Sequence, residues 1–138
     1  MPSAEPLLLD THTLLWWQAG SDRLSAAAAQ AIHEASRILI SPLSCWEITT
    51  LERQGKIELD RDPMTWIHAL FRIPGIEAAD LSPTAAAWAG ALDSSRFPGD
   101  PIDRMLYATA MDLRVRLVTK DERLTAFARV EGTVDVVW

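Results

Sequence analysis

Short, continuous apolar runs alternate along this chain with longer segments in which apolar and polar residues mix. The clearest runs are Leu7–Leu9 and Ile38–Ile40, which lack the polar alternation of a half-exposed strand. Continuous runs of this kind are typical of parallel strands that are buried on both faces. Residues 116–119 and 133–138 are predicted to be further strands, and residues 76–81 a weaker one.

A repeated dipeptide marks the starts of helices. A good N-cap residue precedes proline four times, and the pairs are Ser41-Pro42, Asp62-Pro63, Ser82-Pro83 and Asp100-Pro101. Proline is favoured at the first helical position, so helices are predicted to begin near residues 42, 63, 83 and 101. The helix from residue 101 should run to about Leu113. Further helices are expected over residues 13–18, 26–35 and 121–128.

Strands and helices alternate throughout, without an internal repeat, a low-complexity tract or a linker. This order predicts an α/β fold: a single domain over residues 1–138, with a central parallel β-sheet of about four or five strands flanked by α-helices.

Composition narrows the class of protein. The 138 residues are 49% apolar, enough for one domain with a real core, and the one cysteine, Cys45, excludes an internal disulfide and a cysteine-rich zinc site. No apolar run approaches the length of a membrane span, so a cytoplasmic location without membrane association is expected. The net charge of −6 argues against broad electrostatic binding of nucleic acid.

Four acidic residues follow these structural landmarks. Asp10 ends the first apolar run, Glu47 lies one turn into the segment that opens with Ser41-Pro42, Asp103 follows Asp100-Pro101, and Asp121 follows residues 117–119. Residues beyond the carboxyl ends of parallel strands converge on one crevice, so the four carboxylates are predicted to lie together. They would repel one another unless a cation lay among them, and oxygen ligands suit Mg²⁺ or Mn²⁺.

Each acid also has a purely structural interpretation. Asp103 and Asp121 can satisfy free backbone N–H groups at helix starts. Glu47 could close a capping box with Ser44, but Pro42 places the helix start earlier and makes Glu47 an interior helix residue, where a buried glutamate is uncommon unless it is paired or binds a metal. Asp10 is the hardest to explain this way, because aspartate is depleted in strands. Taken singly each acid favours the structural interpretation, and taken together they favour a metal site.

Four motifs in the expected order resemble the PIN-domain family, and in particular the VapC-type toxins of bacterial toxin–antitoxin modules. The motifs are LLLDTHTLLWW, ISPLSCWEI, DPIDRMLYATA and LVTKDERL, and the resemblance runs from Leu7 to about Phe127. It implies a ribonuclease dependent on Mg²⁺ or Mn²⁺, with Asp10, Glu47, Asp103 and Asp121 as the metal-binding and catalytic carboxylates. It also implies a homodimer, an RNA substrate and a cognate antitoxin protein that covers the active-site groove.

Other side chains have more open interpretations. Arg104 and Lys120 are the nearest basic candidates to steady an RNA phosphate, and Thr119 resembles a polar helper of the fourth acid. His12 could reach the crevice, although a lone histidine is more often surface or core. Helix packing is favoured over base stacking or partner binding for the tryptophans in predicted helices, which are Trp16, Trp17, Trp46 and Trp88.

A second hypothesis treats the chain as a non-catalytic PIN-like binding or regulatory module that acts through a protein partner. On this view the acids only cap helices and no divalent ion is required. The apolar, tryptophan-rich segments at residues 14–17 and 46–51 motivate it.

Overall fold

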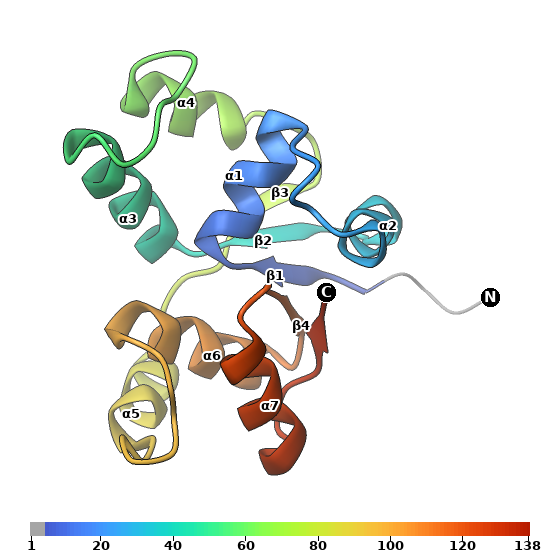
Figure 1. Ribbon diagram of the computed structural model, residues 1–138, viewed down its shortest axis with the longest axis vertical. Coiled ribbons are helices and arrows are strands. Elements are labelled where there is room, and N and C mark those ends of the chain that lie inside the picture. The colour runs from blue at the N-terminus through green and yellow to red at the C-terminus, as the bar shows by residue number, and fades with distance from the viewer. Residues whose placement is uncertain (1–4) are drawn as a thin grey trace.

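The computed structural model describes residues 5–138 and shows a five-stranded sheet in the order β3-β2-β1-β4-β5 (Figure 1). Every pair of neighbouring strands is parallel. The strands are β1 (Leu7–Leu9), β2 (Ile38–Ile40), β3 (Ile76–Ala78), β4 (Arg116–Val118) and β5 (Val136–Val137). The predicted α/β class and parallel sheet are therefore confirmed.

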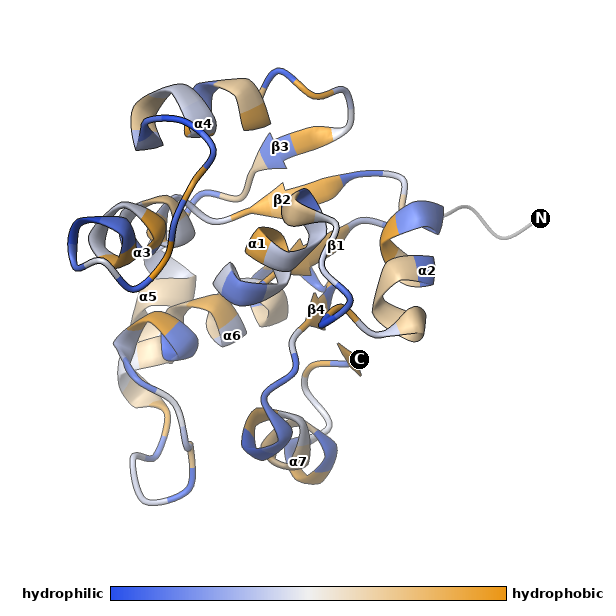
Figure 2. Ribbon diagram, turned by 45° about the horizontal axis from the view of Figure 1, so that its top comes forward, coloured by the Kyte–Doolittle hydropathy of each residue, from blue (hydrophilic) through white to orange (hydrophobic). Residues whose placement is uncertain are grey.

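The central strand β1 divides its leucines between two apolar cores. Leu7 and Leu9 belong to one buried cluster and Leu8 to the other, because successive side chains of a strand point to opposite faces. In β2, Ile38 and Ile40 belong to the first cluster and Leu39 to the second. A strand with helices on both faces needs apolar residues at every position, which explains the continuous runs in the sequence. Figure 2 shows these strands as apolar ribbons inside a more polar exterior.

Four helices supply the first core. They are α1 (Thr11–Ala19), α2 (Ala26–Glu34), α3 (Pro42–Arg53) and α4 (Pro63–Leu70). Leu14, Ile32, Ile48 and Leu70 bring one apolar side chain from each helix to the same cluster. The helices α3 and α4 also contact each other, beyond the edge of the sheet (Figure 1).

Three helices cover the opposite face. They are α5 (Pro83–Ala91), α6 (Pro101–Leu113) and α7 (Glu122–Glu131). Leu106 and Tyr107 of α6 and Leu124 of α7 pack on Leu8. The helix α5 packs on the outside of α6, through a small cluster of alanines. Alanine allows the two helices to approach closely, which accounts for the alanine-rich sequence of α5.

All four predicted cap-proline starts are confirmed. The side chains of Ser41, Asp62, Ser82 and Asp100 each accept a backbone N–H at the start of a helix whose next residue is proline. Three strands are shorter than predicted. β3 ends at Ala78 rather than at residue 81, β4 ends at Val118 rather than at residue 119, and β5 is confined to residues 136–137. The helix α7 extends past its predicted end to Glu131, where Gly132 adopts the left-handed conformation that ends helices.

Candidate active site

The strand order reverses beside β1, and this defines the place of the candidate site. From β1 the chain builds outward through β2 and β3, then returns to the other side of β1 with β4. In open α/β sheets the crevice at such a switch point, beyond the carboxyl ends of the strands, is the usual ligand site. Asp10 follows β1 and Asp121 lies three residues after β4, so both acids lie at this crevice.

Three hydrogen bonds of its backbone N–H and its carboxylate hold Asp10 in place. Its backbone N–H donates to the carbonyl of Val118 at 3.1 Å and so extends the sheet by one residue. One carboxylate oxygen accepts the backbone N–H of Thr13 at 2.8 Å, which makes Asp10 the N-cap of α1. The other oxygen accepts the hydroxyl of Thr119. The helix therefore begins at Thr11, two residues before the predicted start, because Asp10 caps it.

Thr119 joins Asp10 to Asp121. Its buried side chain donates to Asp10 and accepts the backbone N–H of Asp121 at 3.2 Å. Asp121 is the N-cap of α7, and its carboxylate accepts the backbone N–H groups of Arg123 and Leu124. The two acids at the strand ends are thus fixed relative to each other through one threonine.

Asp103 is held by a reciprocal capping box at the start of α6. Its backbone N–H donates to the Asp100 carboxylate at 2.9 Å, and its own carboxylate accepts the backbone N–H of Asp100 at 3.2 Å. Burial together with the nearby negative charges of Asp100, Asp121 and Glu47 raises the pKa of Asp103 to about 7. Asp103 is therefore a partly buried carboxyl that also experiences the negative charges of its three acidic neighbours.

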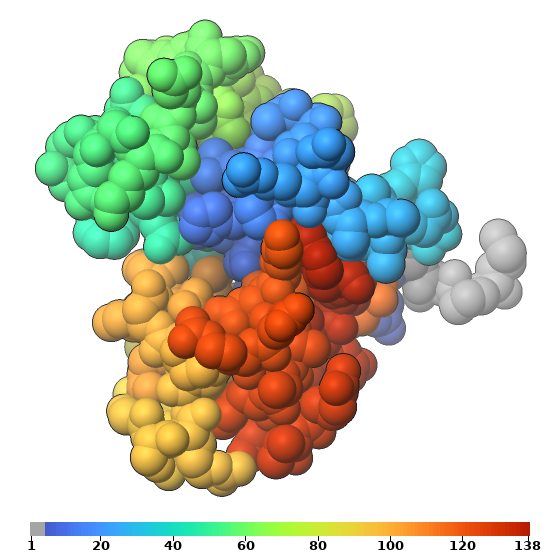
Figure 3. Space-filling view, viewed as in Figure 1, coloured from blue at the N-terminus to red at the C-terminus, as the bar shows by residue number. Residues whose placement is uncertain are grey.

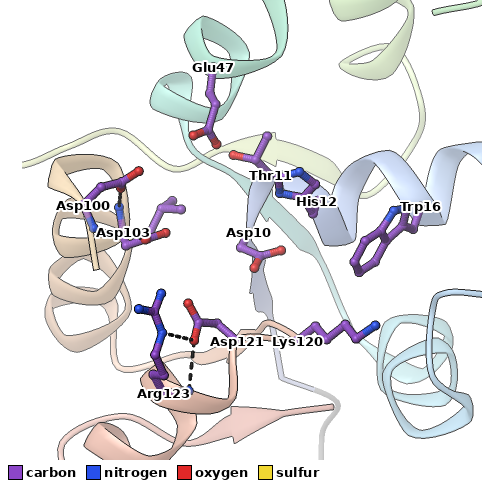
Figure 4. Close-up of a pocket in the computed structure, with 11 residues that line it drawn as sticks. Asp10, Thr11, His12, Trp16, Glu47, Asp100, Asp103, Lys120, Asp121 and Arg123 are labelled. Carbon is purple, nitrogen blue, oxygen red and sulfur yellow. Dashed lines mark hydrogen bonds and ion pairs between the residues drawn. The ribbon is translucent and has the colours of Figure 1, made fainter. Parts of the chain in front are cut away.

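Glu47 is different, because it has no capping role. It lies inside α3, and no hydrogen bond from another residue to its carboxylate is found between residues 5 and 138. Its side chain points from α3 towards Asp10 and Thr11 (Figure 4). Ser44, the suggested capping-box partner, instead accepts the hydroxyl of Thr11 at 3.0 Å, so that interpretation of Glu47 is wrong.

The four predicted acids line one cavity of about 470 Å³. Asp10, Glu47, Asp103 and Asp121 come from four separate segments and all line it, together with Asp100 (Figure 4). The surface dips here, between α1 and α3 on one side and α6 and α7 on the other (Figure 3). The structure therefore brings together all four residues that the sequence singled out.

The donor set fits a hard divalent cation in its chemistry. All four predicted ligands are carboxylates, and a bound cation would offset the negative charge of Glu47 and Asp121 that acts on Asp103. In the part of the chain that the structure describes, however, no group of three or more aspartate, glutamate, histidine or cysteine side chains is arranged so that it could hold a metal ion. The composition of the cavity, rather than an assembled coordination shell, supports a metal.

Two basic side chains border the acidic cavity, and one of them was not singled out from the sequence. Lys120 lines the cavity as predicted. Arg123 lines it too, with its Nε 3.7 Å from the Asp121 carboxylate. Its place two residues after an N-cap aspartate could have identified it, because residues of a first helical turn lie beside their cap.

The prediction for Arg104 is wrong. Its guanidinium donates to the carbonyls of Ala89, at 3.1 Å, and Leu92, at the end of α5. Arg104 also lies over the ring of Phe97. These contacts direct it away from the cavity, and it braces α5 against α6.

The four tryptophans of the predicted helices fall into three groups. Trp17 packs against the first core, as predicted. Trp46 and Trp88 do not pack inside, because 61% and 41% of their surfaces are exposed. Trp16 is half-buried and lines the acidic cavity together with His12.

None of the helices between residues 5 and 138 combines the length and the hydropathy needed to cross a lipid bilayer.

Comparisons with known proteins agree with this geometry. Residues 7–132 match the family model of the PIN domain. The chain is 43% identical over 118 residues to ribonuclease VapC22 of Mycobacterium tuberculosis, covering 86% of this chain and 88% of the relative. Among solved structures, the toxin VapC20 of M. tuberculosis, described as cleaving the sarcin-ricin loop, aligns with a TM-score of 0.65 at 15% identity, covering 94% of this chain and 98% of VapC20. VapBC2 of Rickettsia felis, solved with a promoter DNA fragment, aligns with a TM-score of 0.66 at 12% identity, over 95% of this chain and 96% of that chain.

Proposed function

The chain belongs to the PIN-domain family and to its VapC-type toxins, and from that premise we propose that it is a metal-dependent ribonuclease that acts as the toxin of a toxin–antitoxin pair. The observation that carries the proposal is the convergence of Asp10, Glu47, Asp103 and Asp121 on one cavity at the topological switch point. The relative VapC22 is named a ribonuclease and matches most of this chain, which supports the same activity.

Mg²⁺ or Mn²⁺ is the proposed cofactor, with the four carboxylates as its holders. When bound, such an ion supplies an activated water and stabilises charge on the departing oxygen of the phosphodiester. The Asp10 carboxylate is oriented by the Thr119 hydroxyl and the Thr13 N–H, and the Asp121 carboxylate by the N–H groups of Arg123 and Leu124. Glu47 accepts no hydrogen bond from the residues that the structure describes, and its carboxylate can accept a proton from the attacking water.

The basic side chains of the cavity have a complementary role in the proposal. Lys120 and Arg123 lie on the same side as Asp121 and can hold the phosphate of the substrate (Figure 4). A small number of local cations is compatible with the net charge of −6, because only the phosphates near the scissile bond need neutralising.

One substitution separates catalysis from helix capping. Glu47→Gln removes a charge without removing a cap, so we expect loss of Mn²⁺-dependent cleavage of single-stranded RNA and weaker Mn²⁺ binding, with little change in thermal stability. Glu52→Gln is the matched control, since Glu52 lies on the same helix outside the cavity. Isothermal titration with Mn²⁺ and a gel assay of RNA cleavage provide the two readouts. Equal activity of the two variants would refute the proposed mechanism.

The non-catalytic binding module keeps one observation in its favour. Asp10, Asp103 and Asp121 all stabilise helix starts, which is the structural role that this alternative assigns to them. It predicts that the folded wild type neither binds Mn²⁺ nor cleaves RNA. The same titration therefore decides between the two functions.

A protein partner belongs to the proposal as well. Several of the similar structures are toxin–antitoxin complexes, including those of Klebsiella pneumoniae and R. felis. We propose that a cognate antitoxin covers the acidic cavity of this chain. Homodimerisation and a domain that spans the whole of residues 1–138 remain predictions from the family resemblance.

A further inference from the structure

A cluster of aromatic and basic side chains adjoins the acidic cavity, and we refer to His12, Trp16 and Lys120 as the Trp16 platform. The rings of His12 and Trp16 have centroids 5.8 Å apart and are tilted by 50°. The ammonium of Lys120 lies 5.6 Å from the centroid of the Trp16 ring. On another side Trp138 supports Trp16, with a centroid separation of 5.8 Å. The indole is thus held in place by its neighbours while it still faces a cavity.

The platform lies where two cavities meet. His12 and Trp16 line the acidic cavity, and they also line a second cavity of about 920 Å³ formed by α1, the segment 56–61 and α4. An elongated ligand that passes from one cavity to the other must therefore cross these two rings. Figure 4 shows Trp16 displaced from Asp10 along α1, on the side of the acids away from α6.

The charges around the second cavity favour a chain of phosphates. Arg23, Lys56 and Arg61 border it, against the acids Glu58 and Asp60. Arg61 is paired with Asp60 at 3.0 Å, but Arg23 and Lys56 form no ion pair within residues 5–138. The second cavity thus adds two cations, Arg23 and Lys56, to the aromatic rings that it shares with the acidic cavity. A positively charged path with stacking rings is the usual design for binding single-stranded nucleic acid.

We propose that the Trp16 platform is a nucleotide subsite, in which the base of a nucleotide next to the scissile phosphate stacks on Trp16 and the adjoining phosphate is held by Lys120. Every base has a π-face, so one indole accepts any base without reading the sequence. Lys120 is exposed, and an exposed cation–π contact is weak enough for its ammonium to exchange the ring for a phosphate. The inference rests on the proposed ribonuclease function for the identity of its substrate as single-stranded RNA.

Binding of a short, fluorescein-labelled single-stranded oligo(A) RNA tests the subsite. All variants carry Asp10→Asn, so that binding is measured without cleavage, and circular dichroism verifies their folding. Trp16→Ala should weaken binding about tenfold, and Trp16→Phe should restore it to within about threefold because a ring is retained. Trp88→Ala is the matched control, because Trp88 is a surface tryptophan that lines neither cavity. Its affinity should equal that of the background protein.

Two further readouts address the base and the phosphate separately. One nucleotide at a time is made abasic, so that the adenine is lost and the sugar–phosphate backbone is kept. At one position this loss should weaken binding, and in Trp16→Ala the same loss should have no effect. Lys120→Ala should lower the slope of log affinity against log salt by roughly one phosphate contact. Equal binding by Trp16→Ala and Trp88→Ala would overturn the subsite. The two cavities would then be better explained as a binding site for a protein chain.

The subsite and the ribonuclease function can fail independently. Trp16-dependent RNA binding, together with a wild type that neither binds Mn²⁺ nor cleaves RNA, would support the subsite and refute the ribonuclease proposal. A wild type that cleaves RNA with Mn²⁺, together with a Trp16→Ala variant that binds RNA as Trp88→Ala does, would overturn the subsite and retain the ribonuclease.

Discussion

The two acids at the strand ends and the two on helices differ in how the protein holds them. Asp10 and Asp121 each accept two hydrogen bonds and are linked through Thr119. Asp103 accepts one backbone hydrogen bond and has a strongly raised pKa, while Glu47 accepts none from the residues described. One pair is oriented by the backbone, and the other faces the cavity with little compensation for its charge.

This difference shows how a fold can combine a rigid and an adaptable half in one site. The carboxyl ends of β1 and β4 are neighbours in the sheet, so the backbone hydrogen bonds of the sheet fix the positions of acids placed there. Glu47 on α3 and Asp103 on α6 approach from the two layers. The packing of α3 places Glu47, and the capping box with Asp100 holds Asp103. We expect the strand-end pair to determine where a metal binds, and the helix pair to determine how tightly.

The largest effect is expected from Gly99→Ala, which should displace Asp103 of the helix pair by steric overlap alone. An added Cβ would lie 2.5 Å from the Cβ of Asp103 and 2.7 Å from a ring carbon of Phe97. Asp103 must then move, and a displacement of about 1 Å in an active site can cost roughly 100-fold in rate. We expect RNA cleavage to fall by about that factor in a fixed-time oligonucleotide assay. Gly90→Ala, whose Cβ would meet nothing within 4 Å, is the control and should cleave normally.

Thr119→Val tests the strand-end pair. The substitution keeps the shape of a buried side chain but removes the donor to Asp10 and the acceptor for the Asp121 N–H. Leaving these groups unpaired should cost about 2 kcal/mol in the free energy of unfolding and should weaken Mn²⁺ binding. Thr109→Val removes a hydroxyl that bonds within α6, to the carbonyl of Met105, and should leave Mn²⁺ binding unchanged. Urea denaturation and calorimetry measure the two quantities; equal Mn²⁺ affinities would show that Thr119 does not organise the pair.

Asp103→Asn tests the negative charge around Asp103. The difference in stability between this variant and the wild type should depend on pH. The folded pKa of about 7 exceeds the ordinary value of 3.8, so the folded state retains a proton that the unfolded state releases. The wild type is therefore destabilised as pH rises from about 4 to 7, and Asp103→Asn escapes this loss. Because Asp103 is half-exposed, we expect an advantage of only about 1 kcal/mol for the variant at pH 8 in EDTA, and less at pH 5.

Adding Mn²⁺ should make the wild type more stable than Asp103→Asn. The wild type gains stability from binding the ion, and the variant gains little. Thermal melts at both pH values, with EDTA and with Mn²⁺, give the comparison. A variant that is equally stable to the wild type at pH 8 in EDTA would argue against repulsion among the acids.

The smallest effect is expected from Arg114→Gly, away from both pairs. Arg114 ends α6 with a φ of 55°, a left-handed conformation that favours glycine. The substitution should raise the free energy of unfolding by about 0.5 kcal/mol without changing RNA cleavage. A change in cleavage would mean that the C-terminal end of α6 influences Asp103 at its start.

Local signals in the sequence were enough to predict most of the fold. The cap-proline pairs defined four helix starts because both residues act within one turn, where no tertiary contact is needed. The uninterrupted leucines of β1 indicated a strand buried on both faces for the same reason. The end of β3 was missed because strand length depends on the neighbouring strand, and β2 offers only three partners.

Side chains that reach across the molecule were predicted less well. Arg104 lies next to a predicted site residue, but its long side chain bends back to the carbonyls of α5. Trp46 is a large aromatic residue of the kind that usually packs in a core, and yet its side chain is exposed on α3. In both residues the helix was predicted correctly, and the direction of the side chain depended on which element packs beside it.

The sequence by itself determined the order of strands and helices, the helix caps and the four acids that follow them, because those features depend on neighbours in the chain. Only the tertiary structure decided the strand order β3-β2-β1-β4-β5, which makes Val118 the neighbour of Leu9 and Thr119 the partner of Asp10. It also decided that Trp16 and Lys120, distant in sequence, share one surface beside the acids. These pairings depend on how two apolar faces of one sheet are covered at the same time, and no local pattern encodes that.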